Sequence, residues 1–249
     1  MRLTERKLRT IIRRSLLTEG VYDPGILKAV FLAGGPGSGK SYTAKSIFGV
    51  DKLSKIATMA PSGLKVVNSD PAFEHNLKKA GVDPKKLGDL PEEEWKKHTE
   101  GPHSARGRAK KTKIAARDLY IDGRLGMIID STGDDPNKLL RLRDMLTDLG
   151  YDTYMLFVDT DLDVALERNQ TRDRVLRDDL VRDIWHAAQD SLPVYLTAFG
   201  DSIAVVDNTV YGPVPKDVEK ALLRFVREPV QNPVGKKWIE DELEARRRG

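Results

Sequence analysis

The sequence predicts an α/β fold in which an open, parallel β-sheet lies between layers of helices. Five short apolar runs are typical of buried strands, and they lie at 29–33, 64–68, 126–130, 153–158 and 202–206. Helical patterns separate several of these runs, the clearest being formed by Leu139, Leu142, Leu146 and Leu149 and ended by Gly150. In sheets of this kind ligands bind at the carboxyl ends of the strands.

Length and composition limit the class of protein. A chain of 249 residues suits one domain with insertions or two small domains. No apolar stretch approaches the length of about 18 residues that suggests a membrane span, and the first residues lead into no secretory segment. Cysteine is absent, which excludes disulfides and thiolate metal sites. We therefore expect a cytoplasmic protein.

The first element is a basic segment at the N-terminus. Residues 1–19 carry six basic side chains against two acidic ones, and apolar residues recur there at helical spacing. This pattern predicts a short amphipathic helix, followed by a linker that ends near Gly25. The helix either docks its apolar stripe on the body of the protein or contacts a protein partner, nucleic acid or an anionic membrane surface.

The segment after the first apolar run matches the motif G-x-x-x-x-G-K-[ST] in full. Its glycines allow successive backbone N–H groups to turn inward around a phosphate, and the helix that follows adds the positive end of its dipole. Lys40 would reach the β- and γ-phosphates, while the Ser41 hydroxyl would ligate Mg²⁺. The pattern predicts an ATP site formed by Gly34, Gly35, Pro36, Gly37, Ser38, Gly39, Lys40, Ser41 and Tyr42.

Two acids follow the next strands. Asp70 lies just beyond the second run, where its carboxylate can accept the proton of an acceptor hydroxyl or orient that hydroxyl. A helix cap is the alternative, because Pro71 follows it. Asp130 ends the third run, and an acid at the end of a buried strand needs a compensating partner. We expect Asp130 to hold Mg²⁺ directly or through water.

The interval from 71 to 125 is less regular and is treated as a substrate insert. Proline and glycine pairs interrupt it, a helix is expected to begin near Pro91, and a second helical stripe runs from His103 to Asp122. Lys110, Lys111 and Lys113 crowd this second stripe. Such a run either forms a solvated face or lines a pocket for the acceptor.

Arginines gather after the fourth strand, at positions 168, 172, 174 and 177. Segment 168–180 is predicted to be a lid whose guanidinium groups stabilise a migrating phosphoryl group and exclude water. The intervening acids at positions 173, 178 and 179 favour the alternative of an exposed helix with surface ion pairs.

With these motifs in place, residues 28–209 resemble the P-loop kinases of the zeta toxin group and, more distantly, the kinase domains of polynucleotide kinases. The resemblance implies a kinase-type, three-layer P-loop NTPase fold with a five-stranded parallel sheet in the order 2-3-1-4-5. It implies Asp70 as the base and matches Asp130 and Thr132 to an acid-x-Thr signature. The family acid is often Glu, so Asp130 is one methylene shorter.

The same resemblance assigns the lid arginines and one further residue. Lid arginines of the family contact the nucleotide phosphates, which implies that role for Arg168, Arg172 and Arg174. The run from Val206 to Thr209 is similar to a strand-end motif near the adenine, which places Asn208 at the nucleotide.

The sequence therefore predicts three parts, namely a basic N-terminal helix and linker (1–25), a kinase domain (26–228) and a C-terminal tail (229–249). We expect an ATP- and Mg²⁺-dependent kinase whose acceptor is a hydroxyl of a nucleotide-sugar or another small metabolite. A polynucleotide 5′-hydroxyl kinase is an alternative that an aromatic content of 6% does not favour. A non-catalytic nucleotide-binding protein that holds a partner is the other alternative.

Overall fold

A computed structural model describes residues 20–50 and 59–248, so the helix expected within 1–19 lies outside the described residues. Five parallel strands form one sheet in the order β2-β3-β1-β4-β5, which confirms the predicted order. The strands are β1 (Lys28–Ala33), β2 (Lys65–Val67), β3 (Met127–Asp130), β4 (Asp152–Asp159) and β5 (Ile203–Asp207). Each contains most of one predicted apolar run.

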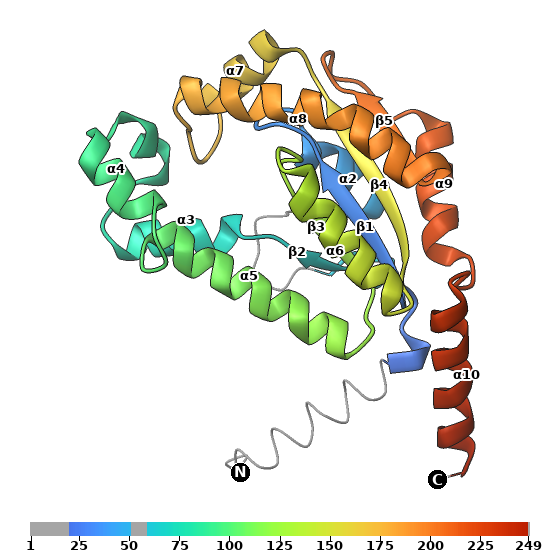
Figure 1. The fold of residues 1–249 in the computed structure, drawn as a ribbon. Helices are drawn as coiled ribbons and strands as arrows, with labels where there is room; N and C mark the ends of the chain where they lie inside the picture. The colour runs from blue at the N-terminus through green and yellow to red at the C-terminus, as the bar shows by residue number, and fades with distance from the viewer. Residues whose placement is uncertain (1–19, 51–58, 249) are drawn as a thin grey trace, which may run out of the picture.

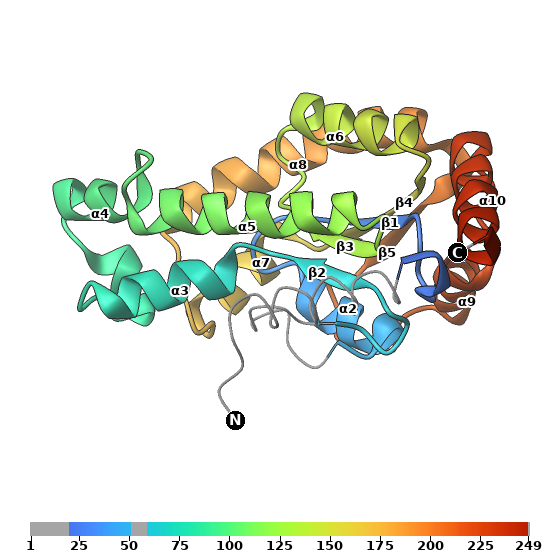
Figure 2. The same ribbon diagram turned by 90° about the horizontal axis from the view of Figure 1, so that it is seen from below.

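Alternate side chains of the central strand point to opposite faces of the sheet, as strand geometry requires. Phe31 belongs to an apolar cluster with residues of α6 (Pro136–Asp148) and α8 (Asp178–Phe199). Leu32 belongs to a second cluster with residues of α2 (Lys40–Phe48) and α9 (Lys216–Arg227). Figures 1 and 2 show these helix pairs on opposite sides of the sheet, so the fold has three layers.

The insert forms a helical arm beyond the edge strand β2 (Figures 1 and 2). Its elements are α3 (Asp70–Lys79), η2 (Pro84–Asp89), α4 (Glu92–Thr99) and α5 (Ala105–Asp122), and they confirm both helices expected there. Phe73, Leu77, Leu87 and Ala109 are buried in a small core of the arm itself, and Trp95 packs against it. The arm therefore has an apolar core in addition to its contacts with the sheet.

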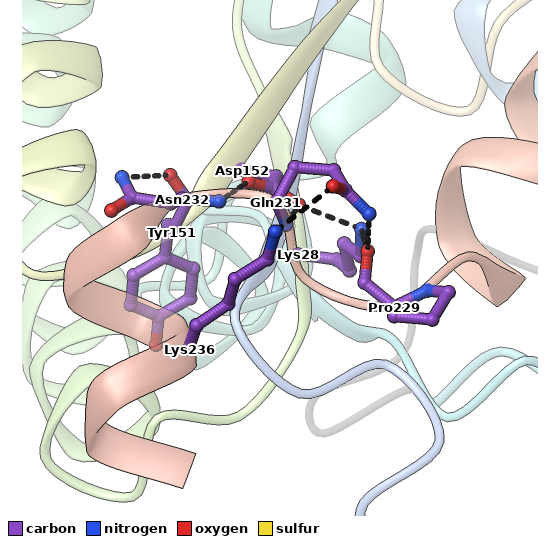
Figure 3. A network of polar contacts seen from close by, with 7 residues as sticks. All are labelled: Lys28, Tyr151, Asp152, Pro229, Gln231, Asn232 and Lys236. Atoms are coloured by element: carbon purple, nitrogen blue, oxygen red, sulfur yellow. Dashed lines mark hydrogen bonds and ion pairs between the residues drawn. The ribbon is translucent and has the colours of Figure 1, made fainter. Parts of the chain in front are cut away.

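The C-terminal segment is a helix, α10 (Pro233–Arg248), that packs on the body near η1 (Gly20–Tyr22). The carboxylate of Asp152, at the start of β4, binds the residues that lead into α10 (Figure 3). It accepts hydrogen bonds from the backbone N–H groups of Gln231 and Asn232 and from Lys28 Nζ, each at 2.8 Å. Among the helices of the described chain, none combines the length and apolar character of a membrane span.

The contact between α10 and the turn before β4 leaves no room for a side chain. A Cβ added to Gly235 would lie 2.2 Å from the carbonyl oxygen of Gly150. Alanine is ordinarily favoured over glycine in a helix by about 1 kcal/mol. The clash is with backbone, so we expect Gly235→Ala to lower the free energy of unfolding by about 1–3 kcal/mol. Urea denaturation checks this, with the exposed Lys237→Ala as the control, and an equal or higher stability of Gly235→Ala would contradict it.

Candidate active site

The glycine-rich loop joins β1 to α2 and bends sharply before the helix begins. Gly39 precedes α2 with φ +89°, a conformation that side chains disfavour. A Cβ there would lie 2.0 Å from Asn208 Nδ2. That amide donates a 2.8 Å hydrogen bond to the carbonyl of Ser38. Asn208, which directly follows β5, therefore lies beside the loop and holds it in shape.

Lys40 is the first residue of α2, and its ammonium group turns back over the loop. Nζ donates hydrogen bonds to the carbonyl oxygens of Gly34 and Gly35, the latter at 3.0 Å. Burial lowers the pKa of Lys40, while the carboxylates of Asp130 and Asp70 act in the opposite direction. The lysine is thus electrostatically coupled to both acids singled out in the sequence.

Ser41 and Tyr42 lie in the exposed first turn of α2, where they are accessible to a ligand of the loop. The Tyr42 hydroxyl donates a 3.0 Å hydrogen bond to the carbonyl of Gly212, beyond β5. Its ring makes an edge contact with Tyr211, the ring centroids lying 5.7 Å apart. Two exposed aromatic rings therefore border the loop on the β5 side.

Asp130 ends β3, beside Leu32 in the register of β1. Burial raises the pKa of Asp130, the nearby Asp70 adds to this, and Lys40 opposes it. One carboxylate oxygen, Oδ1, is buried without a hydrogen-bond partner in the described structure. A buried acceptor without a partner fits a site for a cation, because burial without compensation is costly.

Asp70 is the first residue of α3, and its carboxylate forms a 2.8 Å ion pair with Arg174. Burial alone would raise the pKa of Asp70. The positive charges of Arg174, Arg172 and Lys40 outweigh burial, so the pKa lies below its usual value. The side chain is 35% exposed, so an ionised carboxylate remains accessible to an acceptor. Ser69, not Asp70, is the N-cap of α3.

The predicted lid 168–180 divides into three parts. Arg168 belongs to α7 (Leu162–Gln170) and donates to the carbonyls of Asn208 and Thr209 at 2.8 and 3.0 Å. Its guanidinium lies 4.0 Å from the ring centroid of Tyr211. The connection 171–177 carries Arg172 and Arg174 toward Asp70, and α8 begins after it. Arg168 thus lies on the β5 side of the loop, apart from the other two.

Sequence reasoning gave little weight to one lysine that the structure brings to these charges. Lys113 of α5 donates a hydrogen bond to the main-chain carbonyl of Asp130. Burial lowers its pKa, opposed by Asp130 and Asp70. Helical spacing could have identified Lys113 in the sequence. Arg106, Lys110 and Lys113 lie four and then three residues apart, so they share one face of a helix.

Glu74 was missed altogether. It follows Asp70 by one turn of α3, and burial raises its pKa, while Arg174 opposes this. The four-residue spacing of these two acids was its only signal in the sequence.

The charges form one cluster of both signs, in which Glu74 and Asp134 add to the negative charge of Asp70 and Asp130. Lys40, Lys113, Arg172 and Arg174 surround the two carboxylates of Asp70 and Asp130. No group of three or more His, Cys, Asp or Glu residues that could hold a metal occurs in the described parts of the chain. A Mg²⁺ ion in such a site takes one or two protein oxygens and completes its shell with phosphates and water.

A parallel sheet in this order, with a glycine-rich loop between β1 and α2, defines a P-loop nucleotide-binding fold. Residues 30–194 match the model of a family described as an AAA domain, and the chain belongs to that family. No curated protein matches the sequence.

Two solved structures are similar to this chain. A candidate kinase from Chloroflexus aurantiacus is 15% identical with a TM-score of 0.51, over 80% of this chain and 96% of that one. A structure from the PezAT toxin–antitoxin system of Streptococcus pneumoniae is 14% identical with a TM-score of 0.48, over 97% and 96% of the two chains. The family and the shared fold bear out the predicted resemblance to P-loop kinases at the level of architecture.

Gly39 allows a matched test of the loop. Gly39 and Gly81 both have positive φ, +89° and +77°, but only Gly39 has a neighbour that a Cβ would meet within 4 Å. We expect Gly39→Ala to weaken ATP binding at least about ten-fold, a loss of about 1.4 kcal/mol. Gly81→Ala carries a similar backbone strain and should bind ATP as the wild type does. Titration calorimetry measures both, and equal affinities would contradict the role of the loop.

The pair of Asp70 and Arg174 predicts a shift in titration. Replacing Arg174 with Met removes the largest opposing charge while most of the burial remains, so the pKa of Asp70 should rise. In the wild type, ionised Asp70 stabilises the fold when the pH is above the pKa of this group in the unfolded chain, about 3.9. This stabilisation is lost as the pH falls through the lower pKa that Asp70 has in the folded protein. Carbon-13 NMR of the carboxyl group reports the pKa. An unchanged value in Arg174→Met, with Arg182→Met as control, would contradict the assignment.

Proposed function

We propose that the protein is an ATP- and Mg²⁺-dependent kinase that transfers the γ-phosphoryl group to an acceptor hydroxyl. The observation that carries the proposal is the position of Asp70. Its carboxylate is ionised, partly exposed and coupled electrostatically to Lys40 of the phosphate-binding loop. A protein that only binds a nucleotide does not need such a group there.

The donor side is formed by the loop and its neighbours. Backbone N–H groups of residues 34–41 and the ammonium of Lys40 would hold the triphosphate. Tyr42 and Asn208, which lie toward β5, would border the nucleoside. Ser41 and Asp130 would hold Mg²⁺, which fits the buried oxygen of Asp130 that has no partner in the described structure. The ion would neutralise charge on the phosphate oxygens.

On the acceptor side, Asp70 would take the proton of the hydroxyl as its oxygen attacks the γ-phosphorus. The bond from phosphorus to the β,γ-bridging oxygen breaks, and ADP leaves. Arg172 and Arg174 lie next to Asp70 and would compensate the charge that moves between the two oxygens. Arg168, which the sequence also assigns to this role, would act from the nucleotide side.

Three cations near this centre support an anionic acceptor such as a nucleotide-sugar. Lys110 of α5 lies near Arg106 and near Lys138 of α6. Arg106 lies near Arg174, while Asp134 opposes the repulsion at both Arg106 and Lys110. Burial lowers the pKa of Arg106, and the nearby Arg174 adds to this. A phosphate-bearing acceptor would offset this repulsion between like charges.

Transfer from γ-labelled ATP to a panel of nucleotide-sugars, nucleosides and 5′-hydroxyl oligonucleotides tests the proposal. We expect label on a nucleotide-sugar or related small acceptor. Asp70→Asn should lower turnover by about 10²–10⁴-fold because the proton acceptor is lost. Lys40→Ala should weaken the donor side, and Asp241→Asn on the exposed face of α10 should leave transfer unchanged.

Two results separate the parts of the proposal. Label on no acceptor, with ATP binding intact, would contradict the kinase function. Unchanged transfer by Asp70→Asn would remove only its role as base.

A further inference from the structure

The connection between α7 and α8, residues 171–177, carries two of the arginines that face Asp70, and it is called the strap here. It contains no helix or strand. Its base is closed by Asn169, which is fully buried. The Asn169 amide donates to the carbonyl of Leu176 at 2.8 Å, and its oxygen accepts from the Leu176 N–H at 3.1 Å. These two bonds tie the C-terminal end of the strap, at Leu176, back to α7.

The same end is docked on the insert by Arg177, which follows Leu176 and is the last residue of the strap. Its guanidinium donates to the carbonyl of Leu90 at 2.8 Å and forms an ion pair with Glu92. The same group lies 4.8 Å from the ring centroid of Trp95. Figure 1 shows the α7–α8 connection beside the helical arm that contains α4. Three different contacts therefore join segments more than 80 residues apart in the chain.

The surface that receives Arg177 is itself well supported. Trp95 packs against the small apolar core of the insert. A Cβ on Gly88 would lie 3.4 Å from the carbonyl carbon of Leu176, so the end of the strap runs close to the backbone of η2. Glu92 is 54% exposed, so its ion pair alone contributes little to stability. The carbonyl contact and the stacking on Trp95 define the geometry.

We infer that Arg177 is a positioning residue for phosphoryl transfer, which rests on the proposed kinase function. It acts through Arg172 and Arg174, which precede it by five and three residues and face the reaction centre. Arginine side chains on an undocked loop would sample many positions, and donors stabilise a transition state best when they are held in place beforehand. The insert thus contributes to catalysis by fixing the strap that carries these donors.

This role predicts a specific kinetic effect. Arg177→Ala should lower kcat by about 10- to 100-fold through misplaced donors, while KM for ATP changes by less than about two-fold. Arg177→Lys should recover little, because an ammonium group cannot make the forked and stacked contacts of a guanidinium. The exposed Arg182→Ala on α8 is the matched control and should behave as the wild type.

Trp95→Leu keeps an apolar side chain but removes the ring under Arg177. Its effect on kcat should not add to that of Arg177→Ala, since both break one contact. Thermal unfolding of each variant separates this coupling from a general loss of stability. Additive effects of the two substitutions would overturn the inference.

Hydrogen exchange gives a readout that needs no acceptor. Arg177→Ala should raise amide exchange in both 171–177 and 88–95, and Arg182→Ala in neither. If Arg177→Ala leaves exchange in the strap unchanged, or leaves kcat of an active enzyme unchanged, the role of Arg177 is contradicted while the proposed kinase function stands. A wild-type protein that transfers no label, with the exchange change present, would instead overturn the proposed function and with it the catalytic role of Arg177.

Discussion

The site depends on the mutual compensation of partly buried opposite charges where three parallel strands end. Lys40 follows β1 and its loop, Asp70 follows β2, and Asp130 ends β3. Each of these groups would be costly to bury alone, and burial shifts the pKa values of Lys40 and Asp130 toward the neutral forms. The sheet order β2-β3-β1 brings these three strand ends together and thereby sets the distribution of charge.

The parts outside this cluster keep it in place. Asn208 at the end of β5 binds the loop, and Arg168 binds the segment that carries Asn208. On the other side, Arg174 reaches Asp70 and also lies 5.2 Å from the ring centroid of Phe73, in the core of the insert. The glycine-rich loop is thus supported from the β5 side and the Asp70 carboxylate from the insert. The strap joins the two halves.

Much of this architecture was readable from the sequence, and the remainder depends on contacts between distant segments. Apolar runs and a complete loop motif identify the strands, Lys40 and the acids, because these signals are local. The contact of Arg177 with Trp95 is not local, since it requires the packing of the insert against the strap. Lys113 could not be told apart from the neighbouring lysines in the sequence. Only its position on α5 shows that it is the lysine that points toward Asp130.

In the proposed reaction, the glycine-rich loop and Asp70 act on the same phosphate group of ATP. A crystal structure with a non-hydrolysable ATP analogue and Mg²⁺ tests it most directly. We expect a γ-phosphate that contacts Lys40 and at least one of Arg172 and Arg174 on the side that faces Asp70, with the metal next to Asp130. A γ-phosphate directed away from Asp70, with the Arg174 ion pair intact and no metal near Asp130, would contradict it.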